Sequence, residues 1–155
     1  MSWSFKITNG DLDFSGPDGF ATVTGTAKLI QDLKHWLLEP LGSDPFHPDY
    51  GSALNGGVFP DGRAVPSAIG GLINGESLTR IEAEVRRVLN AYRQMQVSKM
   101  QAEAMLYGGR NTLGVGEILF SINDVKVKQY GDTVLVNCVI TTADGNQVTF
   151  QQSLK

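Results

Sequence analysis

The sequence predicts an α+β fold: a small antiparallel sheet packed against two main helices, with an N-terminal hairpin and a C-terminal three-strand meander. Two stretches have apolar residues at helical spacing, and the C-terminal part alternates or runs continuously apolar at strand length. Asn-Gly and Asp-Gly pairs mark hairpin turns. We expect residues 1–155 to form one domain, because 155 residues is about the size of one ordinary domain.

The N-terminal hairpin is predicted from residues 5–8, which alternate apolar and polar as a half-buried strand does. Asn9-Gly10 is a strong turn pair, and Leu12 and Phe14 continue the alternation beyond it. A Gly-Pro-Asp-Gly loop follows, and residues 20–24 are then expected to form another short strand.

The first helix is predicted over residues 26–38, and Pro40 ends it because proline cannot continue a helix. Its apolar residues are spaced so that they share one face: Ala27, Ile30, Leu33, Trp36 and Leu37. The glycine- and proline-rich residues 41–62 are expected to form a long loop, and such a loop is usually functional. Residues 65–73 are expected to form a short helix with Pro66 in its first turn.

The second helix shows a heptad-like spacing of apolar residues, namely Leu78, Ile81, Val85, Val88, Tyr92 and Met95. Thr79 and Glu82 fit a capping box, whereas Asn74 is the alternative cap for an earlier start. Lys99 interrupts the apolar spacing, which resumes at Ala102 and Leu106. We therefore expect the helix to bend, loosen or change partner near Lys99.

Three strands are expected after the second helix. In residues 117–128 the apolar face switches, from Ile118, Phe120 and Ile122 to Val125 and Val127, which predicts a bulge or bend at Asn123. Residues 134–140 are nearly all apolar, which is typical of a central strand buried on both faces. Residues 146–154 alternate again, and we expect this last strand to have a free edge.

Charge and composition exclude several classes of protein. The net charge of −3 and the pI of about 5.3 argue against nucleic acid as a partner, because phosphate binders carry a basic surplus. The single cysteine, Cys138, allows no intramolecular disulfide and fits folding in a reducing cytoplasm. No secretion signal and no membrane-spanning stretch is recognisable, so we expect no membrane partner.

Catalytic chemistry is not indicated by the side chains. The carboxylates of the middle segment, Glu39, Asp44, Asp49 and Asp61, are typical of solvated turns. Two histidines, His35 and His47, are too few for an ordinary catalytic zinc site, and Cys138 lies in a buried-type strand. We therefore expect no catalytic residue, no cofactor and no metal site.

Three runs in order are similar to a known family: GTAKLIQDL at residues 25–33, WLLEPLG at 36–42 and HPDYGSAL at 47–54. Over residues 20–55 the chain resembles the baseplate wedge family of contractile-tailed phages, a sheath-initiator family often labelled lysozyme-like. It departs from that family after the second helix, where residues 106–111 read LYGGRN and contain no Glu-Pro-Arg element.

The resemblance implies a viral structural protein of the tail baseplate, assembled in the host cytoplasm into a hetero-oligomeric ring, and not an enzyme. Its partners would be the tail sheath protein and other baseplate wedge proteins. Sheath arms would add strands to its sheet. The candidate partner-binding residues are therefore those of the last strand: Gln147, Val148, Thr149, Phe150, Gln151 and Gln152.

The Pro48-Asp49-Tyr50-Gly51 element is interpreted as a tight structural turn rather than a direct partner contact, since each residue type suits a turn. Two other functions remain open at the level of sequence. One is a cell-wall glycoside hydrolase, which would need two carboxylates roughly 5–9.5 Å apart across a cleft. The other is a cytoplasmic adaptor that binds peptides by strand addition without ring assembly.

Overall fold

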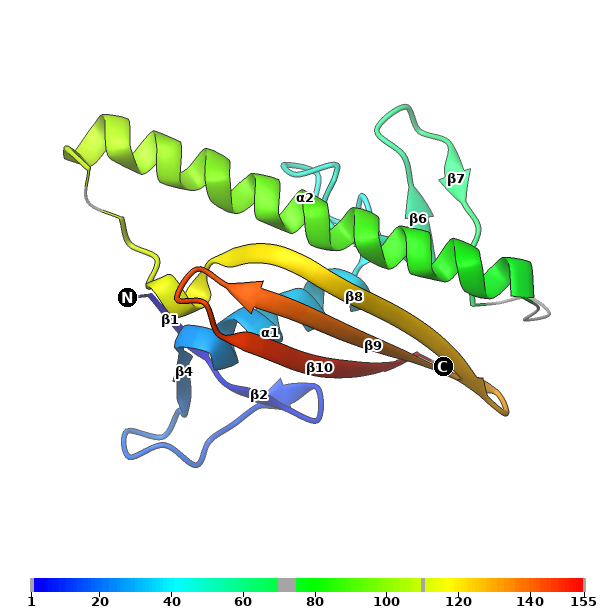
Figure 1. Cartoon of the computed structure of the whole chain (residues 1–155), viewed down its shortest axis with the longest axis horizontal. Coiled ribbons are helices and arrows are strands. Elements are labelled where there is room, and N and C mark those ends of the chain that lie inside the picture. Colours follow the sequence, from blue (N-terminus) through cyan, green and yellow to red (C-terminus); the bar gives the residue numbers. More distant parts are fainter. Residues whose placement is uncertain (1, 70–74, 110, 155) are drawn as a thin grey trace.

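The computed structural model describes residues 2–69, 75–109 and 111–154. It confirms the predicted α+β class: the helices α1 (Gly25–Leu38) and α2 (Gly75–Tyr107) pack against a three-stranded antiparallel sheet (Figure 1). The sheet consists of β8 (Leu119–Tyr130), β9 (Thr133–Thr142) and β10 (Gln147–Leu154) in the order β10-β9-β8. The central position predicted for residues 134–140 is therefore confirmed.

The core fills the space between the two helices and one face of the sheet. On β9, Val134, Val136, Cys138 and Ile140 are completely buried, whereas the alternate residues are only partly buried. The prediction that this strand is buried on both faces thus holds for one face only, because the other face is partly buried. The nearly continuous apolar run arises because Leu135 and Val139 are also apolar on the less covered face.

Two bulges shape β8. The pairing with β9 shifts between Ile122 and Asp124, which confirms the bulge predicted at Asn123. A second shift, between Leu119 and Ser121, was not predicted. It places Leu119, 1% exposed, opposite Thr142 on the buried face and leaves Phe120 66% exposed. The prediction that Phe120 shares a face with Ile122 is therefore wrong, because an extra residue in the ladder reverses the alternation.

The N-terminal segment contains the predicted hairpin. Strands β2 (Ile7–Thr8) and β3 (Asp11–Leu12) pair across Asn9 and Gly10, whose φ values of 55° and 86° suit the tight hairpin turn expected for Asn-Gly. Just outside it, β1 (Trp3–Phe5) pairs with β4 (Thr22–Thr24). Figure 1 shows this segment beside α1 and the β10 side of the sheet.

Helix α1 confirms the helix predicted over residues 26–38, but its buried face is shifted. Leu29, Leu33 and Leu37 are completely buried, whereas Ala27 is exposed. Ile30 and Trp36 pack against the core on either side of the row formed by these three leucines. The prediction followed apolar residues three positions apart, but a helix has 3.6 residues per turn, so residues at that spacing move gradually around the helix. For this reason the prediction did not include Leu29.

The middle segment is more ordered than predicted. It contains β5 (Pro40–Leu41), β6 (Ser52–Val58) and β7 (Ala64–Val65), in the order β5-β6-β7. The predicted loop over 41–62 is therefore partly wrong, and residues 65–69 are not helical; the remainder of the predicted helix, 70–73, lies outside the described residues. A Cβ on Gly57 would lie 2.2 Å from the Leu41 carbonyl oxygen, so glycine permits the close β5–β6 approach.

Helix α2 runs for 33 residues without interruption at Lys99. Thr79 lies inside it and donates its hydroxyl to the Gly75 carbonyl, so the predicted Thr79 cap is wrong; Asn74 lies outside the described residues. The C-terminal end of α2 extends past the sheet in Figure 1, where Leu106 is 75% exposed and Ala102 is also exposed. The predicted resumption of the apolar face there is wrong.

Candidate interaction site

Strand β10 forms one edge of the three-stranded sheet. All of its residues pair with β9, from Gln147 opposite Thr141 to Leu154 opposite Val134, without a bulge. Among the strands that the structure describes, none pairs with the other side of β10. The free edge predicted for the last strand is thus present.

The direction of the free backbone groups follows from the register. The backbone N–H of Thr142 donates to the Asn146 carbonyl at 3.0 Å, which makes this pair a hydrogen-bonded one. Because hydrogen-bonded and non-hydrogen-bonded pairs alternate in an antiparallel ladder, every second residue of β10 directs its N–H and C=O away from β9. These residues are Gln147, Thr149, Gln151 and Ser153.

The six predicted partner-binding residues all lie on β10, but their side chains face two ways. Gln147, Thr149 and Gln151 are exposed on the outer face of the sheet. Phe150 is 4% exposed and belongs to the core, while Val148 and Gln152 are partly buried on the same inner face. A partner at this edge would therefore contact backbone atoms first and only some of the side chains.

The opposite edge, β8, is obstructed. Side chains of α2 bond to the backbone at its start: Gln96 to Glu117 and Leu119, and Arg93 to Phe120. The two bulges and the charged residues Asp124, Lys126 and Lys128 further blunt this edge. By contrast, residues 147–154 of β10 include no charge and no proline, the devices that usually protect an edge strand.

A groove of about 750 Å³ adjoins β10 on the side of its free edge. Gln152 lines it from the sheet, and residues of α1 and the N-terminal hairpin line it from the other side. Gln31 of α1 fixes that hairpin, accepting the Ile7 backbone N–H at 2.9 Å and donating to the Phe5 carbonyl at 2.8 Å. The N-terminal segment that lines the groove opposite β10 is therefore bound to α1 on both sides of Lys6.

The Pro48–Gly51 element packs against the core helices. Tyr50 contacts Trp36 edge-on, with ring centroids 4.9 Å apart, and Arg87 of α2 donates to the Gly51 carbonyl at 3.0 Å. Gly51 has a φ of 90°, and a Cβ there would lie 2.4 Å from the Pro40 carbonyl oxygen. Pro48 and Asp49 line a separate groove beside α2. The structure does not bring this turn together with β10.

Glu117 is a buried polar centre that the sequence analysis missed. Glu117 is only 1% exposed. Its carboxylate accepts hydrogen bonds from the backbone N–H groups of Ser2, Gly25 and Gly114 and from the Ser2 hydroxyl. Burial raises the pKa of the Glu117 carboxyl, but these hydrogen bonds outweigh burial and hold the pKa below its ordinary value. It joins the N-terminal segment, the start of α1 and the 3-10 turn η1 (Val115–Glu117).

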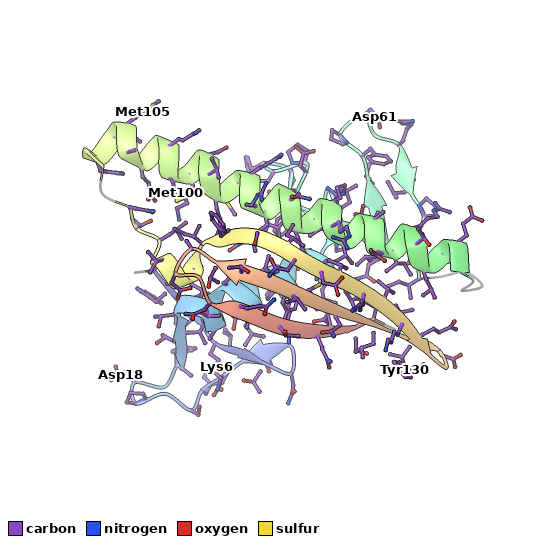
Figure 2. All side chains as sticks on the ribbon, in the orientation of Figure 1. Lys6, Asp18, Asp61, Met100, Met105 and Tyr130 are labelled. Atoms are coloured by element: carbon purple, nitrogen blue, oxygen red, sulfur yellow. The ribbon has the colours of Figure 1, made fainter. Side chains whose placement is uncertain are left out.

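Three of the four carboxylates considered for hydrolysis, those of Glu39, Asp44 and Asp61, have basic neighbours. Asp44 lies 2.7 Å from the His47 ring nitrogen Nδ1, and that hydrogen bond lowers the Asp44 pKa. Asp61 pairs with Arg63 at 2.6 Å and lies at the tip of the β6–β7 hairpin, far from Lys6 in the view of Figure 2.

The Cys138 thiol is not a candidate nucleophile. Burial raises its pKa to about 12, so the thiol stays protonated at neutral pH.

Residues 2–69, 75–109 and 111–154 show neither a metal-binding cluster nor a membrane-spanning helix. In these ranges no group of three or more His, Cys, Asp or Glu side chains is arranged to hold a metal ion. None of the helices in them is both long enough and apolar enough to span a membrane. The free edge of β10 with its adjoining groove is the candidate site.

Comparison with known proteins gives one structural likeness. The chain matches no protein-family model and no curated protein. It is similar in structure to a protein from Geobacter sulfurreducens described as a "putative tail lysozyme", with a TM-score of 0.55 and 14% sequence identity. The likeness covers 86% of this chain and 95% of the other. At this identity, it shows that the two chains share a fold.

Proposed function

We propose that this chain is a structural component of a contractile phage tail baseplate that initiates sheath assembly by accepting a β-strand at the free edge of β10. The observation that carries the proposal is the bulge-free edge of residues 147–154, which has no charged residue or proline. The fold shared with a protein described as a tail lysozyme supports it. So does the resemblance of residues 20–55 to baseplate wedge proteins.

Strand addition suits this edge physically. Its outward N–H and C=O groups supply the affinity of an added strand through main-chain hydrogen bonds, and the groove beside them receives side chains. In the proposed assembly the guest strand comes from the tail sheath protein. Other wedge proteins complete a hetero-oligomeric ring in the virion baseplate.

We propose a structural role rather than an enzymatic one. The acidic residues of the middle segment lie beside basic side chains in three cases, Glu39 with His35, Asp44 with His47 and Asp61 with Arg63. A glycosidase would instead need one carboxyl held protonated in a cleft opposite a second carboxylate. The purified protein is expected to leave peptidoglycan intact, and hydrolysis that Glu39→Gln or Asp49→Asn abolishes would contradict this part.

The proposal is tested by co-purification with the tail sheath protein encoded in the same phage genome region. Removing β10 is a poor test, because Phe150 and Leu154 are buried in the core. Thr149→Pro is sharper: the Thr149 N–H points away from β9, so proline blocks the free edge without removing a hydrogen bond to β9.

Thr149→Ala is the matched control, since it keeps the backbone N–H. We expect the wild type and Thr149→Ala to retain the sheath protein and Thr149→Pro to lose it, with all three folded by circular dichroism. If a folded Thr149→Pro variant still retained the sheath protein, the interface would lie elsewhere than at β10. A strand-addition adaptor would bind a peptide at this edge but would form no ring with wedge proteins.

A further inference from the structure

The α1 helix offers a second, partly apolar face beside β10. Its first face, Leu29, Leu33 and Leu37, is completely buried under the sheet. Next to it, Ala27, Ile30, Lys34 and Leu38 line the groove that adjoins the free edge. Ile30 is only partly buried and Leu38 is 43% exposed. A strand added to β10 would extend the sheet over this second face.

Lys34 lies within this face without an acidic partner. The other lysine of the groove is matched, because Lys6 pairs with Asp13 at 2.7 Å. Among the described residues no carboxylate lies within ion-pair distance of Lys34, although the lysine is partly buried. A partly buried, unmatched cation favours an acidic group on whatever covers it.

The register limits where that acidic group would sit. Gln152 faces inward from β10 and lines the groove together with Lys34. Residues paired across neighbouring strands point to the same face of a sheet. The guest residue opposite Gln152 would therefore face α1, and the guest residues two positions before and after it would face the apolar parts of the same helix.

Resting on the proposed strand addition, we propose that β10 and α1 together select an extended segment with Asp or Glu opposite Gln152 and apolar residues two positions to either side. Lys34 is the specificity-determining residue: it pairs with the guest carboxylate, while Ile30 and Leu38 contact the flanking apolar side chains. The edge supplies affinity for any strand, and this face of α1 discriminates among strands.

The test uses three labelled nine-residue peptides, VTVTXTVTV, in which X is Glu, Gln or Lys, and measures binding by fluorescence anisotropy. We expect the wild type to bind the Glu peptide about fivefold more tightly than the Gln peptide, and the Lys peptide most weakly. In Lys34→Glu the order should reverse. Lys128→Glu, which makes the same charge change on the opposite edge strand, should keep the wild-type order.

The outcomes separate this inference from the function on which it rests. Equal binding of the three peptides, lost in Thr149→Pro, would overturn the acidic preference and uphold strand addition. A preference for Glu that survives in folded Thr149→Pro would overturn strand addition and the inference with it. Failure of all three peptides to bind would overturn the inference, while Thr149-dependent capture of the sheath protein would still support the proposed function.

Discussion

The side-chain amide of Gln96 accepts the backbone N–H of Leu119 at 2.9 Å and donates to the Glu117 carbonyl at 2.7 Å. It thereby pairs with the backbone much as a neighbouring strand would, and it does so where β8 begins. Gln96 is only 2% exposed. Helix α2 thus covers the beginning of the β8 edge with a side chain, whereas the outer side of β10 is unpaired among the described strands.

Gln96→Leu should destabilise the protein, because it leaves two buried backbone groups without a partner. We expect a loss of about 1–3 kcal/mol of unfolding free energy for each group. Gln94→Leu, on an exposed position of the same helix, should change stability by less than about 0.5 kcal/mol. Urea denaturation of both variants checks this, and equal stabilities would contradict the role assigned to Gln96.

Glu117→Gln should weaken the junction of the N-terminal segment, α1 and η1 by about 1–3 kcal/mol at pH 7, since three backbone N–H groups lose a charged acceptor. Because the folded-state pKa of Glu117 is lowered, its contribution is present above the unfolded pKa and is lost as the pH falls through the folded pKa.

The stability difference between the wild type and Glu117→Gln should therefore shrink in acid. Denaturation measured from pH 7 down to about pH 3 checks this, since a glutamate in the unfolded chain has a pKa near 4.3. Asp132→Asn, on an exposed turn residue, is the control and should show no comparable change. A difference that stays constant across this range would show that the Glu117 charge is not responsible.

Gly51→Ala should cost more stability than Gly62→Ala, although both glycines have φ values between 80° and 90°. An added Cβ at Gly62 meets no atom within 4 Å, so only backbone strain of about 1 kcal/mol is expected. At Gly51 it would also collide with backbone atoms of Glu39 and Pro40. Thermal unfolding of the pair measures the difference, and similar melting temperatures would contradict the close approach.

Leu89→Ala and Leu106→Ala contrast the two ends of α2. Leu89 is completely buried, so its truncation should cost about 2–5 kcal/mol. Leu106 is 75% exposed, and its truncation should change stability by less than about 0.5 kcal/mol. A large loss for Leu106→Ala in the isolated protein would mean that the end of α2 packs against something in solution.

The sequence predicted the elements whose periodicity is undisturbed. Asn9-Gly10, α1, the long α2 and the three C-terminal strands follow directly from local spacing and turn chemistry, and so does the bulge at Asn123. Strand β6 was not predicted, because Gly56 and Gly57, with φ values of 80° and 147°, interrupt its alternation and are typical of a loop in sequence. Their conformations follow from the contact with β5, which is not local.

The candidate site was predictable only in part. Alternation placed residues 147–152 on a terminal strand, and the structure shows its edge unpaired among the described strands. Lys34, Gln96 and Glu117 were not found, because a single polar residue in an amphipathic helix or before a strand gives no periodic signal. Their roles depend on which distant backbone or groove they face.

Hydrogen exchange at individual backbone amides of β10 tests the central claim most directly. In the free protein, Gln147, Thr149, Gln151 and Ser153 should exchange quickly, whereas Val148, Phe150 and Gln152 should be protected by β9. Adding the tail sheath protein should slow exchange at the first set and leave the second set unchanged. A complex that forms while the amides of the first set keep exchanging quickly would contradict strand addition at this edge.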